Sequence, residues 1–121
     1  MSADTTPALC DCPSGPADCQ AAFCPYYHHS IELIGRRWSG DILRALLHDV
    51  HRFCDLRARI PDISDRMLAA RLREREAAGL SRREVIPEMP VRVEYYLTPH
   101  GQMVRPVVEA IGSWAAEWME R

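Results

Sequence analysis

Between Ser64 and Thr98 the apolar residues change their spacing twice, and this fixes the order of elements that the chain can form. After Ser64 they recur at helical spacing as far as Gly79. Serine is typical of a helix start and glycine of a helix end. Residues 80–86 and 91–97 instead alternate apolar and polar side chains, as strands do. The four residues between these runs include two prolines. The sequence therefore predicts a helix over 65–78, a rigid-tipped hairpin and a further helix.

Three shorter helices are expected before this segment. The first begins at Cys24, whose following proline suits the first helical position, and ends near Gly35. Ser39 is predicted to cap the second helix, in which four aliphatic residues fall on one face. The third covers 52–60 and stops before a proline.

The last helix is expected over 98–120, with Thr98 as its cap and a kink at Pro106. The helices over 52–60 and 65–78, with the tight turn between them, form a helix-turn-helix, and the hairpin forms its wing. The predicted fold class is α+β, mainly α: a winged helix-turn-helix with N- and C-terminal dimerisation helices. We expect an irregular cysteine-rich arm over 1–22 and one domain over 23–121.

The charge is distributed unevenly along the chain. The protein has 121 residues, a formal net charge of −2 and 26% charged residues, which fits one globular domain and excludes a uniformly basic protein that coats nucleic acid. All 15 cations are arginine. Residues 1–35 carry a net charge of −4, residues 36–92 carry +4 and residues 93–121 carry −2. The basic middle block indicates an anionic partner, although a mixed solvated surface gives similar counts.

Double-stranded DNA is the partner that this pattern favours. The helix over 65–78 is expected to enter the major groove, where arginine commonly binds guanine and small side chains allow close approach. On this helix and its cap, the candidate contacts are Ser64, Arg66, Ala69, Ala70 and Arg73. On the wing they are Arg82, Arg83 and Arg92, which suit phosphate or the minor groove. The alternative is a solvated face with internal pairs such as Arg71 with Glu74.

An apolar stripe follows the predicted last helix. A domain of this size cannot readily bury two tryptophans and a full apolar face on a peripheral helix, so a dimer interface is the better interpretation. Its members are Val104, Val107, Val108, Ile111, Trp114 and Trp118. Trp38, in contrast, is expected in the core.

Cysteines are concentrated near the N-terminus. Cys24 at a helix start is a candidate redox sensor, because the helix dipole favours its thiolate; the alternative is an ordinary half-buried thiol. Cys10, Cys12 and Cys19 together with Cys24 form an alternative Zn²⁺ or iron–sulfur site, although their spacing is no standard metal signature. Cys54 is expected to be structural.

With no signal peptide and no membrane span, we expect a cytoplasmic protein. No catalytic motif is found, which predicts that the protein is not an enzyme.

An ordered series of short motifs resembles the HxlR-type winged-helix transcription regulators of bacteria, relatives of the MarR group. The matching residues are Cys24-Pro25, Ile34-Gly35-Arg36-Arg37-Trp38, Ile42-Leu43-Arg44, Arg52-Phe53-x-x-Leu56, Pro61-x-Ile63-Ser64-x-Arg66-Met67-Leu68, Arg71-Leu72-Arg73-Glu74, Gly79-Leu80, Arg92-Val93-Glu94-Tyr95-x-Leu97-Thr98, Gly101 and Trp114. The resemblance covers residues 24–118.

The resemblance implies a homodimer joined through its terminal helices and bound to operator DNA with partial dyad symmetry. It also implies thiol sensing at Cys24, since several members use a cysteine at that place. One departure is Arg75, where the family usually has leucine; we expect that end of the helix to pack loosely, or Arg75 to pair with Glu76 or the partner chain. Two alternatives stay open: a regulator switched by a small ligand, and a metal-binding or protein-interaction module that does not use DNA.

Overall fold

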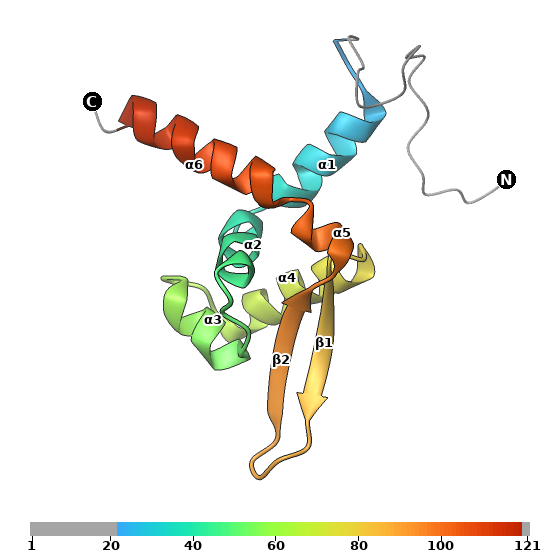
Figure 1. Ribbon diagram of the computed structural model, residues 1–121, viewed down its shortest axis with the longest axis vertical. Coiled ribbons are helices and arrows are strands. Elements are labelled where there is room, and N and C mark those ends of the chain that lie inside the picture. The colour runs from blue at the N-terminus through green and yellow to red at the C-terminus, as the bar shows by residue number, and fades with distance from the viewer. Residues whose placement is uncertain (1–21, 120–121) are drawn as a thin grey trace, which may run out of the picture. The chain divides into compact units, whose positions relative to one another are not determined.

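The computed structural model describes residues 22–119 as six helices and one two-stranded sheet (Figure 1). The elements are α1 (Pro25–Gly35), α2 (Ser39–Leu47), α3 (Phe53–Arg59), α4 (Asp65–Ala77), β1 (Ser81–Ile86), β2 (Arg92–Leu97), α5 (Pro99–Gln102) and α6 (Arg105–Met119). This order confirms the predicted winged helix-turn-helix. The described chain divides after Arg37, so that α1 belongs to one unit and α2 to α6 form the other. Within residues 22–119, no helix combines the length and apolarity that crossing a membrane requires.

The core of the second unit is built around α2. Aliphatic residues at positions i, i+1, i+4 and i+5 of this helix point to one side, and all four are buried. Leucines and isoleucines of α3, α4 and the turns beside them pack with them, together with two residues of β2. The buried apolar side chains of this unit are Ile42, Leu43, Leu46, Leu47, Leu56, Ile60, Ile63, Leu68, Leu72, Tyr95 and Leu97.

Both ends of α4 are fixed by local hydrogen bonds, and the helix lies within one residue of its predicted range. Ser64 is its N-cap, and the hydroxyl oxygen accepts a hydrogen bond from the backbone N–H of Met67 at 3.0 Å. At the other end Gly79 has φ +80°, and the backbone N–H of Leu80 donates to the carbonyl of Arg75 at 2.9 Å. This is the Schellman arrangement that glycine favours. It turns the chain directly from α4 into β1.

The two strands pair antiparallel, from Ser81 opposite Leu97 to Ile86 opposite Arg92. The segment just before α3, which the sequence did not predict to contact the wing, forms an isolated antiparallel bridge with β2 in which Arg52 is paired with Glu94. The backbone N–H of Tyr95 donates to the carbonyl of His51 at 2.8 Å, and the His51 Nδ1 lies 2.9 Å from the carbonyl oxygen of Tyr95. The wing is thereby attached to the chain just before α3.

The start of α2 differs from the prediction. Trp38, not Ser39, is the N-cap residue, and it has a left-handed conformation with φ 76°. Ser39 is the first helical residue and is fully buried. A residue in this position cannot cap the helix, so the prediction for Ser39 is wrong. Trp38 is half-buried at this turn rather than enclosed in the core.

The predicted helix over 98–120 is in fact two helices. Thr98 caps the short α5, as expected, by accepting a hydrogen bond from the backbone N–H of Gly101 at 3.1 Å. The chain then turns at Met103 and Val104, and α6 begins at Arg105. Pro106 is therefore the second residue of a new helix, where its missing N–H is not needed. The prediction of one helix kinked at Pro106 is wrong.

Candidate nucleic-acid interface

The outer face of α4 presents the predicted DNA contacts. Arg66 and Arg73 are exposed, and Ala69 and Ala70 between them are half-buried, as one strip of the helix at spacings of three and four requires. Ser64 at the cap is exposed as well. Because its hydroxyl oxygen accepts the cap hydrogen bond, its O–H remains able to donate to a phosphate.

The arginines of α4 fall into two groups. Over residues 22–119, neither Arg66 nor Arg73 has an ion-pair partner. Arg71 instead pairs with Glu74, its Nη1 lying 2.8 Å from the Oε2 of that carboxylate, which confirms the pairing proposed as the alternative for this helix. The guanidinium groups that point outward are thus the ones without carboxylate partners, and they are available to phosphates or bases.

Arg75 is the residue whose environment the sequence predicted least well. It is completely buried, and its Nη1 donates a hydrogen bond to the hydroxyl oxygen of Ser39 on α2. Its Nη2 lies 3.6 Å from the Oε1 of Glu74. Arg75 therefore contacts Ser39 and Glu74, and its side chain is enclosed where this end of α4 faces the start of α2. The expectation of a loosely packed helix end is wrong.

The arginines of the wing differ in how they are held. Arg82 lies 3.4 Å from a carboxylate oxygen of Glu84, and its guanidinium covers the ring of Tyr96 at 4.7 Å from the centroid. Arg92 is only partly exposed and bridges two carboxylates, at 3.3 Å from Glu88 and 3.0 Å from Glu94. Arg82 and Arg92 are thus engaged within the wing.

Arg83 is the exposed wing arginine that has no ion-pair partner among the described residues. It borders a cleft of about 400 Å³ between the wing and the start of α3, which Arg52 also lines. Arg92 lines the same cleft but is held by two carboxylates, so Arg52 and Arg83 are the arginines there that suit a phosphate of the DNA backbone. Arg52 was not among the predicted contacts, because nothing in its local sequence places it beside the wing.

A hydrogen-bonded pair stiffens the outer face of the wing. The hydroxyl of Tyr96 donates to Glu94 and holds the pKa of that carboxyl below its ordinary value, and the same bond raises the pKa of Tyr96. The ring of His51 stacks on Tyr96 with 4.1 Å between centroids. These contacts fix the wing to the segment before α3, so that wing and helix-turn-helix form one surface.

The cysteines take different positions. Cys24 is the N-cap residue of α1 and is buried, and its side chain forms no cap hydrogen bond. Cys54, expected to be structural, is exposed near the start of α3, and that prediction is wrong. Cys10, Cys12 and Cys19 lie outside the described residues. Over residues 22–119 no group of three His, Cys, Asp or Glu side chains is arranged to hold a metal, and the proposed four-cysteine site stays a prediction.

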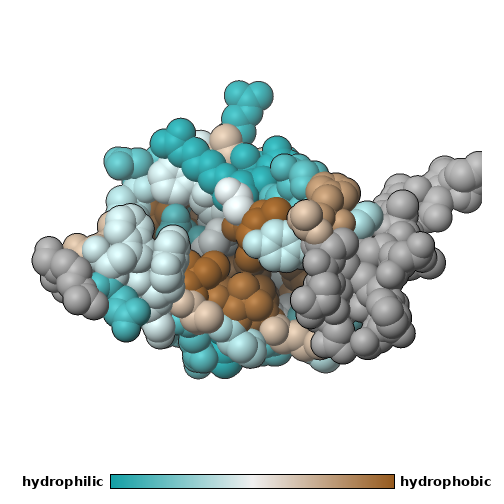
Figure 2. Space-filling view, turned by 90° about the horizontal axis from the view of Figure 1, so that it is seen from above, coloured by the Kyte–Doolittle hydropathy of each residue, from teal (hydrophilic) through white to brown (hydrophobic). Residues whose placement is uncertain are grey.

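The apolar stripe of α6 lies open. Val107, Ile111, Trp114 and Trp118 are between 43% and 63% exposed, and the two tryptophan rings contact each other at 5.5 Å between centroids. Val104 and Val108 are half-buried where α6 meets α2. Figure 2 shows a group of hydrophobic side chains open to solvent on the face seen from above. A helix with this composition needs a partner surface.

Three comparisons place these features among known proteins. Residues 33–121 match the model of the HxlR-like helix-turn-helix family. The HTH-type transcriptional regulator YvaP of Bacillus subtilis is 39% identical over 101 residues, covering 84% of this chain and 94% of YvaP. The crystal structure of diamide-treated YodB from B. subtilis superposes with a TM-score of 0.67 at 37% identity, covering 81% of this chain and 97% of YodB. The redox regulator HypR in its reduced form gives a TM-score of 0.71 at 34% identity, covering 76% and 91%.

Proposed function

The chain belongs to the HxlR-like helix-turn-helix family of transcription regulators, and we propose that it works as a homodimer that binds operator DNA through α4 and the wing and responds to oxidants or electrophiles through Cys24. The observation that carries the DNA-binding proposal is the strip on α4 formed by Arg66 and Arg73, two exposed arginines with no ion-pair partner within residues 22–119. Between them stand two alanines, which allow the helix to approach the floor of the major groove closely.

The open stripe of α6 supports the homodimer. Four of its apolar side chains, including two tryptophans, would lie in water in a monomer. A symmetric dimer would bury this stripe against its own copy. It would also place two copies of α4 on one face of a duplex, which requires an operator with two related half-sites.

The DNA-binding proposal is tested by selecting duplexes from a random-sequence pool with the purified protein. We expect enrichment of one motif with partial dyad symmetry. Arg66→Ala is expected to lower the affinity for the selected duplex about 10-fold to 100-fold, since one arginine–base contact contributes about 1–3 kcal/mol. Fluorescence anisotropy at fixed salt measures it.

Arg59→Ala is the matched control. Arg59 is also an exposed arginine, in the last turn of α3, and is not a predicted DNA contact. It is expected to change the affinity by much less than Arg66→Ala does. Equal losses in the two variants would mean that α4 does not read the sequence, and a pool without any enriched motif would contradict the proposal as a whole.

The sensing proposal rests on the position of Cys24 at the start of α1 and on two structural neighbours, the redox regulator HypR and the diamide-treated YodB. Diamide would oxidise the Cys24 thiols of the two protomers to an intersubunit disulfide and take up the two hydrogens. We expect diamide to release the wild-type protein from its selected duplex and Cys24→Ser to remain bound. Cys54→Ser, which alters the exposed thiol of α3, serves as the control and should respond like the wild type. Release of the Cys24→Ser protein by diamide would show that Cys24 is not the sensor.

A further inference from the structure

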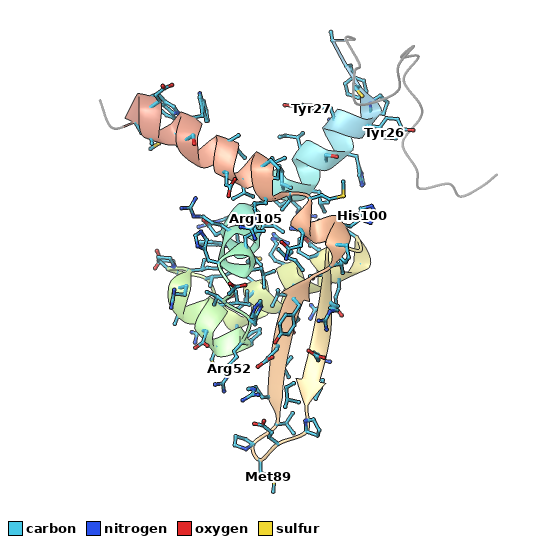
Figure 3. The ribbon with its side chains drawn as sticks, in the orientation of Figure 1. Tyr26, Tyr27, Arg52, Met89, His100 and Arg105 are labelled. Carbon is cyan, nitrogen blue, oxygen red and sulfur yellow. The ribbon has the colours of Figure 1, made fainter. Side chains whose placement is uncertain are left out.

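The tip of the wing is exposed and largely apolar. Met89 is 98% exposed and Val91 is 61% exposed, and prolines stand at positions 87 and 90. Figure 3 shows Met89 at the far end of the hairpin, away from the labelled Arg52 near the start of α3. Over six-residue strands the hairpin carries this tip about 20 Å from the end of α4. An unbranched apolar side chain held out in water by a rigid hairpin indicates a contact.

The tip carries no cation of its own. The nearest arginine, Arg92, stands at the first residue of β2 and bridges Glu88 and Glu94 at 3.3 Å and 3.0 Å. Inserting Arg92 into a groove would require breaking both ion pairs. The bridge also places a positive charge beside Glu88, the one charged residue between the strands, although Arg92 shares that charge with Glu94. Residues 81–97 hold three arginines and three glutamates, so the wing as a whole can approach a polyanion without a net negative charge.

The DNA interface continues onto the wing. β1 follows α4 after the single turn at Gly79, and the exposed arginines lead from Arg73 on the helix to Arg82 and Arg83 on the strand. A DNA duplex that is bound along α4 through its phosphates therefore lies beside the wing as well. The minor groove is about 6 Å wide, too narrow for a two-stranded ribbon but open to one unbranched side chain at its tip. Methionine and proline are among the residues that proteins wedge between base steps there.

We propose that Met89 is an apolar wedge that enters the minor groove beside the half-site read by α4, partly unstacks a flexible base step and bends the DNA. This inference rests on the proposed DNA binding. It makes the tip a determinant of sequence preference, because pyrimidine–purine steps unstack most easily. Arg83 and Arg52 then hold phosphates at the cleft beside α3, and Met89 supplies the deformation.

The test measures both affinity and bending on the duplex that the wild-type protein selects from a random pool, with fluorophores at the two ends to report the bend by energy transfer. The wild type is expected to shorten the end-to-end distance. Met89→Ala is expected to lose most of this bend and about tenfold in affinity, with the salt dependence of binding unchanged because no phosphate contact is removed. Met89→Leu, which keeps an apolar side chain, should restore both. Met103→Ala, which alters another exposed methionine in the turn before α6, is the control and should behave like the wild type.

Three results would overturn the inference: a duplex left straight by the wild type, wild-type bending by Met89→Ala, or a Met89→Ala variant whose salt dependence falls together with its affinity. In the first two cases the apolar tip serves a contact other than DNA. Failure of the proposed function looks different, since the wild type would then select no duplex at all. Circular dichroism confirms that each variant is folded, as expected for a side chain that contacts no core residue.

Discussion

Replacing Arg75 with alanine is expected to lower the free energy of unfolding by about 3–5 kcal/mol, because it breaks a buried charged network and leaves a cavity. Arg75 is fully buried and links α4 to the first residue of α2 through the hydroxyl of Ser39. Without it, that buried hydroxyl loses its donor. Urea unfolding followed by tryptophan fluorescence, at one fixed protein concentration because a dimer is expected, measures the effect.

A second substitution separates charge from packing. Arg75→Leu fills much of the same volume, and leucine is the usual residue at this place in the family that the sequence resembles. Glu74 still has Arg71 at 2.8 Å, so that its carboxylate is not left alone. The remaining loss is the hydrogen bond to Ser39, worth about 1 kcal/mol. Adding Ser39→Ala to the Arg75→Leu protein should remove this remaining loss as well, because the buried hydroxyl without a donor is then gone. An Arg75→Ala protein that unfolds at the wild-type urea concentration would contradict the role of this network.

The elements that the sequence predicted correctly are those whose signals lie close together in the chain. Ser64 caps the start of α4 through Met67, three positions later, and the turn at Gly79 ends the helix with a bond from Leu80 to Arg75, five positions earlier. Thr98 likewise caps α5 from three positions before Gly101. The exposure of Arg66 and Arg73 follows from helical spacing alone. These features need no knowledge of tertiary packing, and the structure reproduces them.

The features that the sequence missed depend on partners far away in the chain. Ser39 resembles a cap by its residue type, but it bonds to Arg75, 36 positions later. His51 joins the sheet through Tyr95, 44 positions later. The ion pairs of Arg92 depend on the length of the hairpin turn and on the alternation of β2, which bring Glu88 and Glu94 beside it. Local patterns of residue type hold no information on such contacts, and so the availability of each wing arginine could not be predicted.

Contacts between residues far apart in the chain also decide which arginines of the wing region are free to bind DNA. Arg92 was a candidate for groove insertion because of its position in the motif, whereas the structure holds it between two carboxylates. Arg83 of the wing and Arg52 before α3, which both line the cleft beside α3, have the freer guanidinium groups. These two arginines suit phosphates, and the largely apolar tip of the wing suits an apolar contact.

Gly101→Ala is expected to destabilise the protein by about 3 kcal/mol, because no space exists for a methyl group at this position. A Cβ built on Gly101 lies 2.0 Å from the carbonyl oxygen of Leu80 and 2.9 Å from the Cδ2 of Leu97. The first contact is with backbone, which cannot rotate away as a side chain can. That carbonyl also accepts a hydrogen bond from the backbone N–H of Thr98 at 2.9 Å, and therefore both sides of the clash are fixed.

Gly35→Ala is the matched control, since a Cβ at Gly35 meets no atom within 4 Å and alanine is favoured over glycine in a helix. Its midpoint in urea should equal or slightly exceed that of the wild type. Gly101→Ala should also weaken DNA binding more than its stability alone explains, because α5 holds the base of β2 beside the start of β1 and any shift there moves the wing relative to α4. A Gly101→Ala protein with wild-type stability would mean that α5 can move away from Leu80, and the wing would then not be rigidly attached at its base.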